Sequence, residues 1–95
     1  MKFDWFRLKA ESNLKKHGGV SFAEAATAFD DPFQTALADD AHSIGEQRFI
    51  LLASSAEGRI LSSSYTERGE VTRLISAREA TRAEVKEYES HIYGA

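Results

Sequence analysis

Four polar side chains near the N-terminus recur at helical spacing and have the chemistry to bind and cleave a phosphodiester. Lys9, Asn13 and His17 stand four residues apart, and Lys16 follows Asn13 by three. On a helix these positions share one side. Ammonium groups hold phosphates and an imidazole transfers protons near neutral pH, which RNA cleavage requires. The competing interpretation is a solvated helix face that ends on a histidine favoured by the helix dipole.

A second basic group is spread over the C-terminal half of the chain. Its members are Arg48, Arg59, Arg68, Arg73 and Arg78. Arginine suits phosphate recognition, and Arg, Lys, His and Tyr can together supply the base, the acid and the charge stabilisation for RNA cleavage without metal. Tyr65 is a candidate partner of Arg73. For any single arginine, pairing with a surface carboxylate is the competing interpretation.

The motifs of other chemistries are missing from the sequence. It has no cysteine, no glycine-rich phosphate loop and no His-Glu-x-x-His motif, and its three histidines are scattered. The acidic pairs Asp30-Asp31 and Asp39-Asp40 are better explained as helix-stop and loop residues than as ligands of a hard cation. We therefore expect no metal site and no cofactor.

Length and composition predict one globular domain over residues 1–95, with 42% hydrophobic and 28% charged residues. No apolar stretch approaches the roughly 20 residues that cross a bilayer, and no signal-peptide pattern is visible, so we expect a cytoplasmic protein without a membrane partner. The net charge of −3 argues mildly against nucleic acid. Residues 19–47 carry six acids and no Lys or Arg, so this segment could hold a basic protein partner.

Periodicity predicts the elements that position these groups. A short strand over residues 2–5 precedes a helix over 6–17, which ends at Gly18-Gly19. Ser21 and Glu24 have the spacing of a capping box for a short second helix, and Asp30-Asp31-Pro32 stops it. A strand near residues 33–37 and a loop follow.

The second half of the chain predicts a meander and a closing helix. Residues 48–53, 59–66 and 71–76 have strand character, and Thr81 with Glu84 forms a second capping box. A two-residue turn at Arg68-Gly69 would place Arg73 and Tyr65 on opposite faces, whereas a bulge would change that register. The expected fold is α+β, an antiparallel sheet of three to four strands with two N-terminal helices and one C-terminal helix.

Short motifs are spread over most of the chain. They include Lys16-His17-Gly18, Phe29-x-Asp31-Pro32, His42-Ser43-x-Gly45-Glu46-x-Arg48 and Arg73-x-Ile75-Ser76-Ala77-Arg78. Through the order and spacing of these motifs, the sequence resembles the BrnT toxin family. The resemblance implies a RelE-like fold and a type II toxin that cleaves RNA without metal and arrests growth. It also implies neutralisation by a BrnA-like ribbon-helix-helix antitoxin, with DNA contacted only through that antitoxin.

The resemblance also selects the candidate site. Its catalytic candidates are His17, Arg48, Tyr65 and Arg73, and its RNA-binding candidates are Lys9, Asn13, Lys16, Arg68 and Arg78. The chain departs from the family pattern in its double glycine Gly18-Gly19, in Ser62-Ser63-Ser64 and in its acidic charge. These departures motivate the alternative of a catalytically weak or inactive homologue that acts as an antitoxin-binding co-repressor. A standalone DNA-binding protein is less favoured because no helix-turn-helix pattern is visible.

Overall fold

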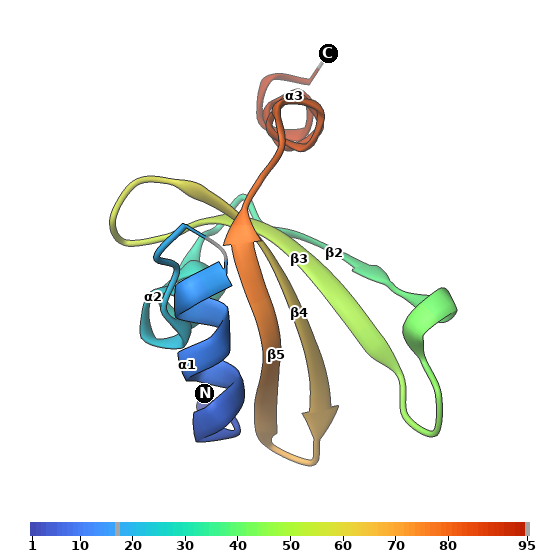
Figure 1. Ribbon diagram of the computed structural model, residues 1–95. Helices are drawn as coiled ribbons and strands as arrows, with labels where there is room; N and C mark the ends of the chain where they lie inside the picture. The colour runs from blue at the N-terminus through green and yellow to red at the C-terminus, as the bar shows by residue number, and fades with distance from the viewer. Residues whose placement is uncertain (17, 95) are drawn as a thin grey trace.

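The computed structural model describes residues 1–16 and 18–94, which form one five-stranded sheet with helices packed around it (Figure 1). The elements follow one another as β1 (Lys2–Asp4), α1 (Arg7–Lys16), α2 (Phe22–Thr27), the 3-10 turn η1 (Ala28–Asp30), β2 (Thr35–Ala38), the 3-10 turn η2 (Asp40–His42), β3 (Arg48–Ser54), β4 (Ile60–Arg68), β5 (Val71–Glu79) and α3 (Arg82–Tyr93). The strand order across the sheet is β1-β5-β4-β3-β2.

The expected antiparallel sheet of three to four strands is wrong, although the α+β class holds. The sheet has five strands and is mixed, because β1 pairs with β5 in parallel while the other neighbours are antiparallel. The helical part is also revised, since α2 is a six-residue helix continued by η1. A parallel pair between the two ends of the chain has no turn residues or local pattern to announce it.

The core lies between one face of the sheet, here called the inner face, and the segment containing α2 and η1. Its buried side chains are Val20, Phe22, Ala25, Ala28, Phe29, Leu51, Ala53, Leu61, Tyr65, Leu74 and Ala77. Phe29 meets Phe3 and Tyr65 edge-to-face, with ring centroids 5.1 and 5.0 Å apart. These contacts tie β1 and β4 to η1.

Side-chain caps fix the beginnings of two helices. Thr81 and Glu84 form the reciprocal capping box expected for α3. Ser21 caps α2 by accepting from the Glu24 backbone N–H, but the Glu24 carboxylate binds Arg59 instead of closing a second box. The helix positions were therefore predictable, and the role of Glu24 was not.

The last helix, α3, lies beyond the end of β5 (Figure 1), and its buried Tyr88 joins it to the segment that follows η1. The Tyr88 hydroxyl donates to Asp31, whose carboxylate also accepts from the backbone N–H of Phe33 and of Ser54. Burial, followed by the Asp31 contact, raises the pKa of Tyr88 to about 12. Among the helices that the structure describes, none is long and apolar enough to cross a membrane.

Candidate functional site

The face of the sheet opposite the core, here called the outer face, carries a β-bulge in β5. Ser64 pairs with Ser76 and Tyr65 pairs with Leu74, so Ile75 is the extra residue. Leu74 and Ala77 are buried in the core, while Ile75 and Ser76 are half-buried between them. The bulge therefore turns two consecutive side chains toward the outer face, where alternation would supply one.

Two shallow grooves meet at this bulge. The first, here the lysine groove, has a volume of about 220 Å³ and is lined by Lys9, Ser12, Asn13, Lys16, Ile75 and Ser76. The second, here the histidine groove, has a volume of about 280 Å³ and is lined by Asp39, His42, Arg48, Ile50, Ser64, Ile75 and Ser76. Because Ile75 and Ser76 line both of them, the two grooves adjoin at the bulge, and together they are here called the outer-face depression.

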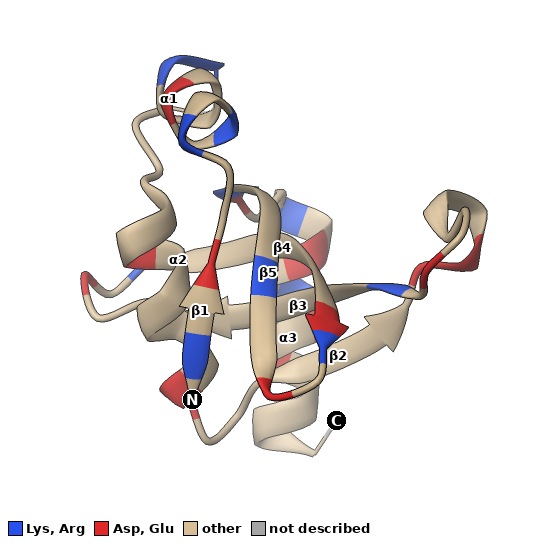
Figure 2. Cartoon of the chain, turned by 90° about the horizontal axis from the view of Figure 1, so that it is seen from below, with Lys and Arg blue, Asp and Glu red and all other residues tan. Residues whose placement is uncertain are grey.

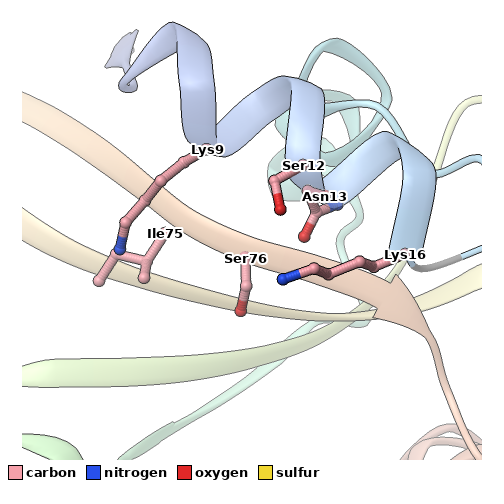
Figure 3. Close-up of a pocket in the computed structure, with 6 residues that line it drawn as sticks. All are labelled: Lys9, Ser12, Asn13, Lys16, Ile75 and Ser76. Carbon is pink, nitrogen blue, oxygen red and sulfur yellow. The ribbon is translucent and has the colours of Figure 1, made fainter.

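In the lysine groove, two side chains extend from α1 over β5. Figure 3 shows the Lys9 chain ending beside Ile75 and the Lys16 chain reaching toward Ser76. Lys9, Asn13 and Lys16 therefore lie on one side of α1, as their spacing predicted. Figure 2 shows several basic positions on α1, and the two that line the groove, Lys9 and Lys16, make this end of the depression cationic.

Asn13 lies at the base of the lysine groove but its polar atoms are already used. Its amide donates to the backbone oxygens of Val20 and Ala77, at 3.0 and 2.7 Å, and its oxygen accepts from the Ala77 N–H at 3.0 Å. The side chain is only 4% exposed. This geometry positions α1 against β5 and leaves Asn13 with little left to offer a ligand.

The histidine groove contains an oriented imidazole. His42 Nδ1 lies 2.9 and 3.1 Å from the two carboxylate oxygens of Asp39. Asp39 precedes η2 and also holds the loop, because its backbone oxygen accepts from the Ser43 hydroxyl. A carboxylate that accepts from Nδ1–H fixes the tautomer with a lone pair on Nε2. The pair therefore has the arrangement of a general base with its orienting acid.

One row of residues runs across four strands beside this groove. Arg48 pairs with Thr66, Thr66 with Arg73, and Arg73 with Asp4. Two strand spacings separate Arg48 from Arg73, or about 10 Å between their backbones. Both arginines therefore belong to the outer face, on either side of a buried threonine.

The two arginines of this row differ in their contacts. Among the described residues, Arg48 has no carboxylate partner. Arg73 donates to Asp4 at 2.9 Å and lies over the Phe6 ring, 4.3 Å from its centroid. Its Nε and Nη1 atoms are buried, without a hydrogen-bond partner in the described part of the chain. Arg48 is thus the freer cation, and Arg73 is the one with unused donors.

The other three arginines are engaged by carboxylates. Arg59 binds Glu24 and Glu79, Arg68 binds Glu46, and Arg78 binds Glu84. Arg68 lowers the pKa of Glu46 and Arg78 lowers that of Glu84, in each case mainly through hydrogen bonds. An RNA phosphate would have to compete with these carboxylates for Arg68 or Arg78.

Tyr65 lies on the inner face, away from the arginine row. Its ring stacks on that of Phe49, with 5.4 Å between the ring centroids, and the residue is only 7% exposed. Burial raises the pKa of its hydroxyl. The bulge therefore does not bring Tyr65 and Arg73 to one face of the sheet.

The structure places Lys9 and Lys16 in one groove and Arg48 in the adjoining one, where it adds His42 and Asp39, which sequence reasoning had treated as loop residues. Their Asp-x-x-His spacing was the available signal, although it becomes informative only when the turn η2 is known. His17 lies outside the described residues. Over residues 1–16 and 18–94, no three His, Asp or Glu side chains gather as metal ligands would.

Comparisons with known proteins identify the relatives of this chain. The family model for the BrnT ribonuclease toxin of type II toxin–antitoxin systems matches residues 5–84. The crystal structure of the Brucella abortus ribonuclease toxin BrnT superimposes with a TM-score of 0.62 at 22% identity, covering 86% of this chain and 99% of that one. At that identity the superposition shows the fold. A search of curated proteins found no match.

Proposed function

The chain belongs to the BrnT family of ribonuclease toxins of type II toxin–antitoxin systems, and on this premise we propose that its outer-face depression cleaves RNA. The observation that carries the proposal is the His42–Asp39 pair in the same groove as Arg48. An oriented imidazole and a free guanidinium are the two groups that transesterification at phosphorus needs most.

In the proposed reaction the 2′-oxygen of a ribose attacks the adjacent phosphorus, and the bond from phosphorus to the 5′-oxygen breaks. His42 Nε2 takes the proton of the 2′-hydroxyl, while Asp39 stabilises the imidazolium that forms. Arg48 neutralises the charge that develops on the phosphorane oxygens. The products are a 2′,3′-cyclic phosphate and a 5′-hydroxyl.

The leaving 5′-oxygen needs a proton donor, for which His17 remains our candidate. It follows Lys16, whose side chain lines the lysine groove. In this scheme Lys9 and Lys16 hold the phosphates that flank the cleaved bond, and Arg73 is a second guanidinium beside Arg48. Every step uses groups of the chain itself, so the proposed cleavage is independent of metal.

Cleavage of a labelled single-stranded RNA by the purified chain tests the proposal. We expect His42→Ala and Arg48→Ala each to reduce the rate about 100-fold or more, the usual effect of removing an acid–base or charge-stabilising group. The matched controls are His91→Ala and Arg82→Ala, because both side chains are exposed on α3 and outside the two grooves. We expect these two variants to cleave like the wild type.

The same assay checks the chemistry. Products should end in a 2′,3′-cyclic phosphate, and the rate should be unchanged by a chelator. Full activity of both His42→Ala and Arg48→Ala would overturn the site, and loss of activity with chelator would overturn metal independence. Induced expression should arrest growth in the wild type only, and co-expression of a BrnA-like antitoxin should relieve it.

One observation favours the second candidate function, an inactive homologue that binds its antitoxin and assists repression. Four of the five arginines between residues 48 and 78 are already paired with carboxylates, and the net charge is −3. Absence of cleavage and of growth arrest in the wild type, with an antitoxin complex still formed, would establish that function.

A further inference from the structure

The edge strand β2 lacks three of the devices that usually oppose pairing with another chain, namely a charged residue, a proline and a bulge. The strand reads Thr35-Ala36-Leu37-Ala38, without charge or proline, and its pairing with β3 is regular over four residue pairs. Strand edges are normally blunted by lysine, proline or a bulge. In Figure 1, β2 forms the outermost strand on its side of the sheet.

The register identifies which backbone groups this edge offers. The Asp39 N–H donates to the Arg48 oxygen, so Asp39, Leu37 and Thr35 direct their backbone groups toward β3. Because the direction alternates along a strand, the N–H and C=O groups of Ala36 and Ala38 point away from the sheet. A further strand would be paired through these two residues.

A groove beside this edge defines the chemistry of the occupant. It lies between β2 and α3, has a volume of about 200 Å³ and is lined by Thr35, Leu37, Ala38, Asp39, Ile50, Leu52, Glu84 and Glu87. Its floor is apolar, and every charged residue in its lining is an acid. Leu37 is 64% exposed, so an apolar partner side chain has a surface to cover.

We propose that β2 receives one additional strand from a protein partner, an extended segment that carries apolar and basic side chains. The proposal rests on the proposed function in one respect, because a type II toxin has an antitoxin to bind. Charge argues against a second copy of this chain, since a pair of β2 edges would bring together two segments of residues 19–47, each with six acids and no Lys or Arg.

A strand added at this edge would lie next to the histidine groove and could change the setting of His42. The β2–α3 groove and the histidine groove share Asp39 and Ile50. A basic side chain that pairs with Asp39 competes with His42 for the carboxylate that orients it. Strand addition at this edge is therefore expected to inhibit cleavage as well as to bind.

A ten-residue peptide of alternating lysine and valine is the probe, because either register presents one valine face and one lysine face. We expect it to slow hydrogen exchange of the Ala36 and Ala38 amides at least tenfold. A peptide of alternating glutamate and valine should leave that exchange unchanged. Binding of the lysine peptide without slower exchange at these amides would overturn the proposal, because it would be charge attraction alone.

Two variants of the whole chain sharpen the test. Ala36→Pro removes an outward N–H at an edge position that tolerates proline, and it should weaken peptide binding at least tenfold, while Ala36→Ser should not. Leu37→Lys, at an exposed side chain, should weaken binding even if Ala36→Pro fails to fold. Unchanged binding of a folded Ala36→Pro, or of Leu37→Lys, overturns the proposal. So does amide protection that rises with protein concentration without peptide, because the occupant would then be a second copy.

The two proposals fail separately. Amide protection by the peptide in a chain that cleaves no RNA would leave this inference standing and refute the nuclease. Cleavage without peptide-dependent protection would refute only the inference.

Discussion

The side-chain amide of Asn13 forms both hydrogen bonds of a β-bridge with the backbone of Ala77. Its nitrogen donates to the Ala77 oxygen at 2.7 Å and its oxygen accepts from the Ala77 N–H at 3.0 Å. Within residues 1–16 and 18–94, β1 pairs with β5 only over Val71 to Arg73, and no strand lies beside the edge of β5 near Ala77. A side chain of α1 completes that edge and places the lysine groove beside the bulge.

We predict that Asn13→Ala destabilises the fold by about 2 to 4 kcal/mol, because it leaves the buried Ala77 groups without partners. Urea unfolding followed by circular dichroism measures this free energy. Ser12→Ala, one residue away in the same groove, should cost less than about 0.5 kcal/mol. Wild-type stability of Asn13→Ala combined with weaker RNA binding would instead show that Asn13 contacts RNA.

Lys9 and Lys16 are predicted to contact RNA phosphates and to contribute little to the stability of the fold. The double variant Lys9→Gln/Lys16→Gln should reduce the slope of log K against log salt by roughly 1.4 for a single-stranded RNA, because each phosphate contact contributes about 0.7. Fluorescence polarisation at four salt concentrations measures the slope. Lys15→Gln, on α1 but outside the groove lining, is the control and should retain the wild-type slope.

Helices and strands were predicted well where a local sequence pattern, such as a capping box or an apolar run, was sufficient to identify them. The Thr81–Glu84 capping box begins α3 as expected, and the apolar run from Arg48 is a strand. The parallel β1–β5 pair could not be predicted, since it depends on contacts across the whole chain. The register of the β4–β5 hairpin could not be predicted either. A turn at Arg68-Gly69 would have paired Thr66 with Val71, whereas the turn is Gly69-Glu70 and pairs Thr66 with Arg73.

The sequence predicted which residue types form the site better than it predicted which residues contact one another there. Lys9 and Lys16 share a groove with Ser76, as helical spacing on α1 allowed. The position of Arg73, held by Asp4 from β1, depends on the same unpredicted parallel pair. His42 became a candidate only when η2 placed it against Asp39 and in the same groove as Arg48.

Tyr65 is predicted to act through packing. Tyr65→Phe should cleave RNA at the wild-type rate, because the ring lies on the inner face and contacts Phe49 and Phe29. Tyr65→Ala should cost about 3 to 5 kcal/mol of stability, as a large-to-small change in a core does. A loss of rate in a stable Tyr65→Phe variant would return the hydroxyl to the list of catalytic groups.

The Glu24–Arg59 pair is predicted to make part of the stability depend on pH. Arg59 Nε and Nη2 bind the two Glu24 oxygens at 2.7 and 2.6 Å, and the Ser55 hydroxyl adds a third bond at 2.7 Å. The Arg59 hydrogen bonds, opposed by burial, lower the pKa of Glu24 from its usual 4.5 to about 2. A carboxyl whose folded pKa is depressed stabilises the fold above its unfolded pKa and loses that contribution as the pH falls.

The stability difference between the wild type and Glu24→Gln should therefore be constant above about pH 5 and shrink by about 3 kcal/mol between pH 5 and pH 2. Unfolding in urea over that pH range measures it. The control is Glu79→Gln, since Glu79 binds the same arginine but its side chain is 59% exposed, and its difference should change little with pH. A Glu24→Gln difference that stays flat down to pH 2 would mean that the buried carboxyl is stabilised by packing and not by its charge.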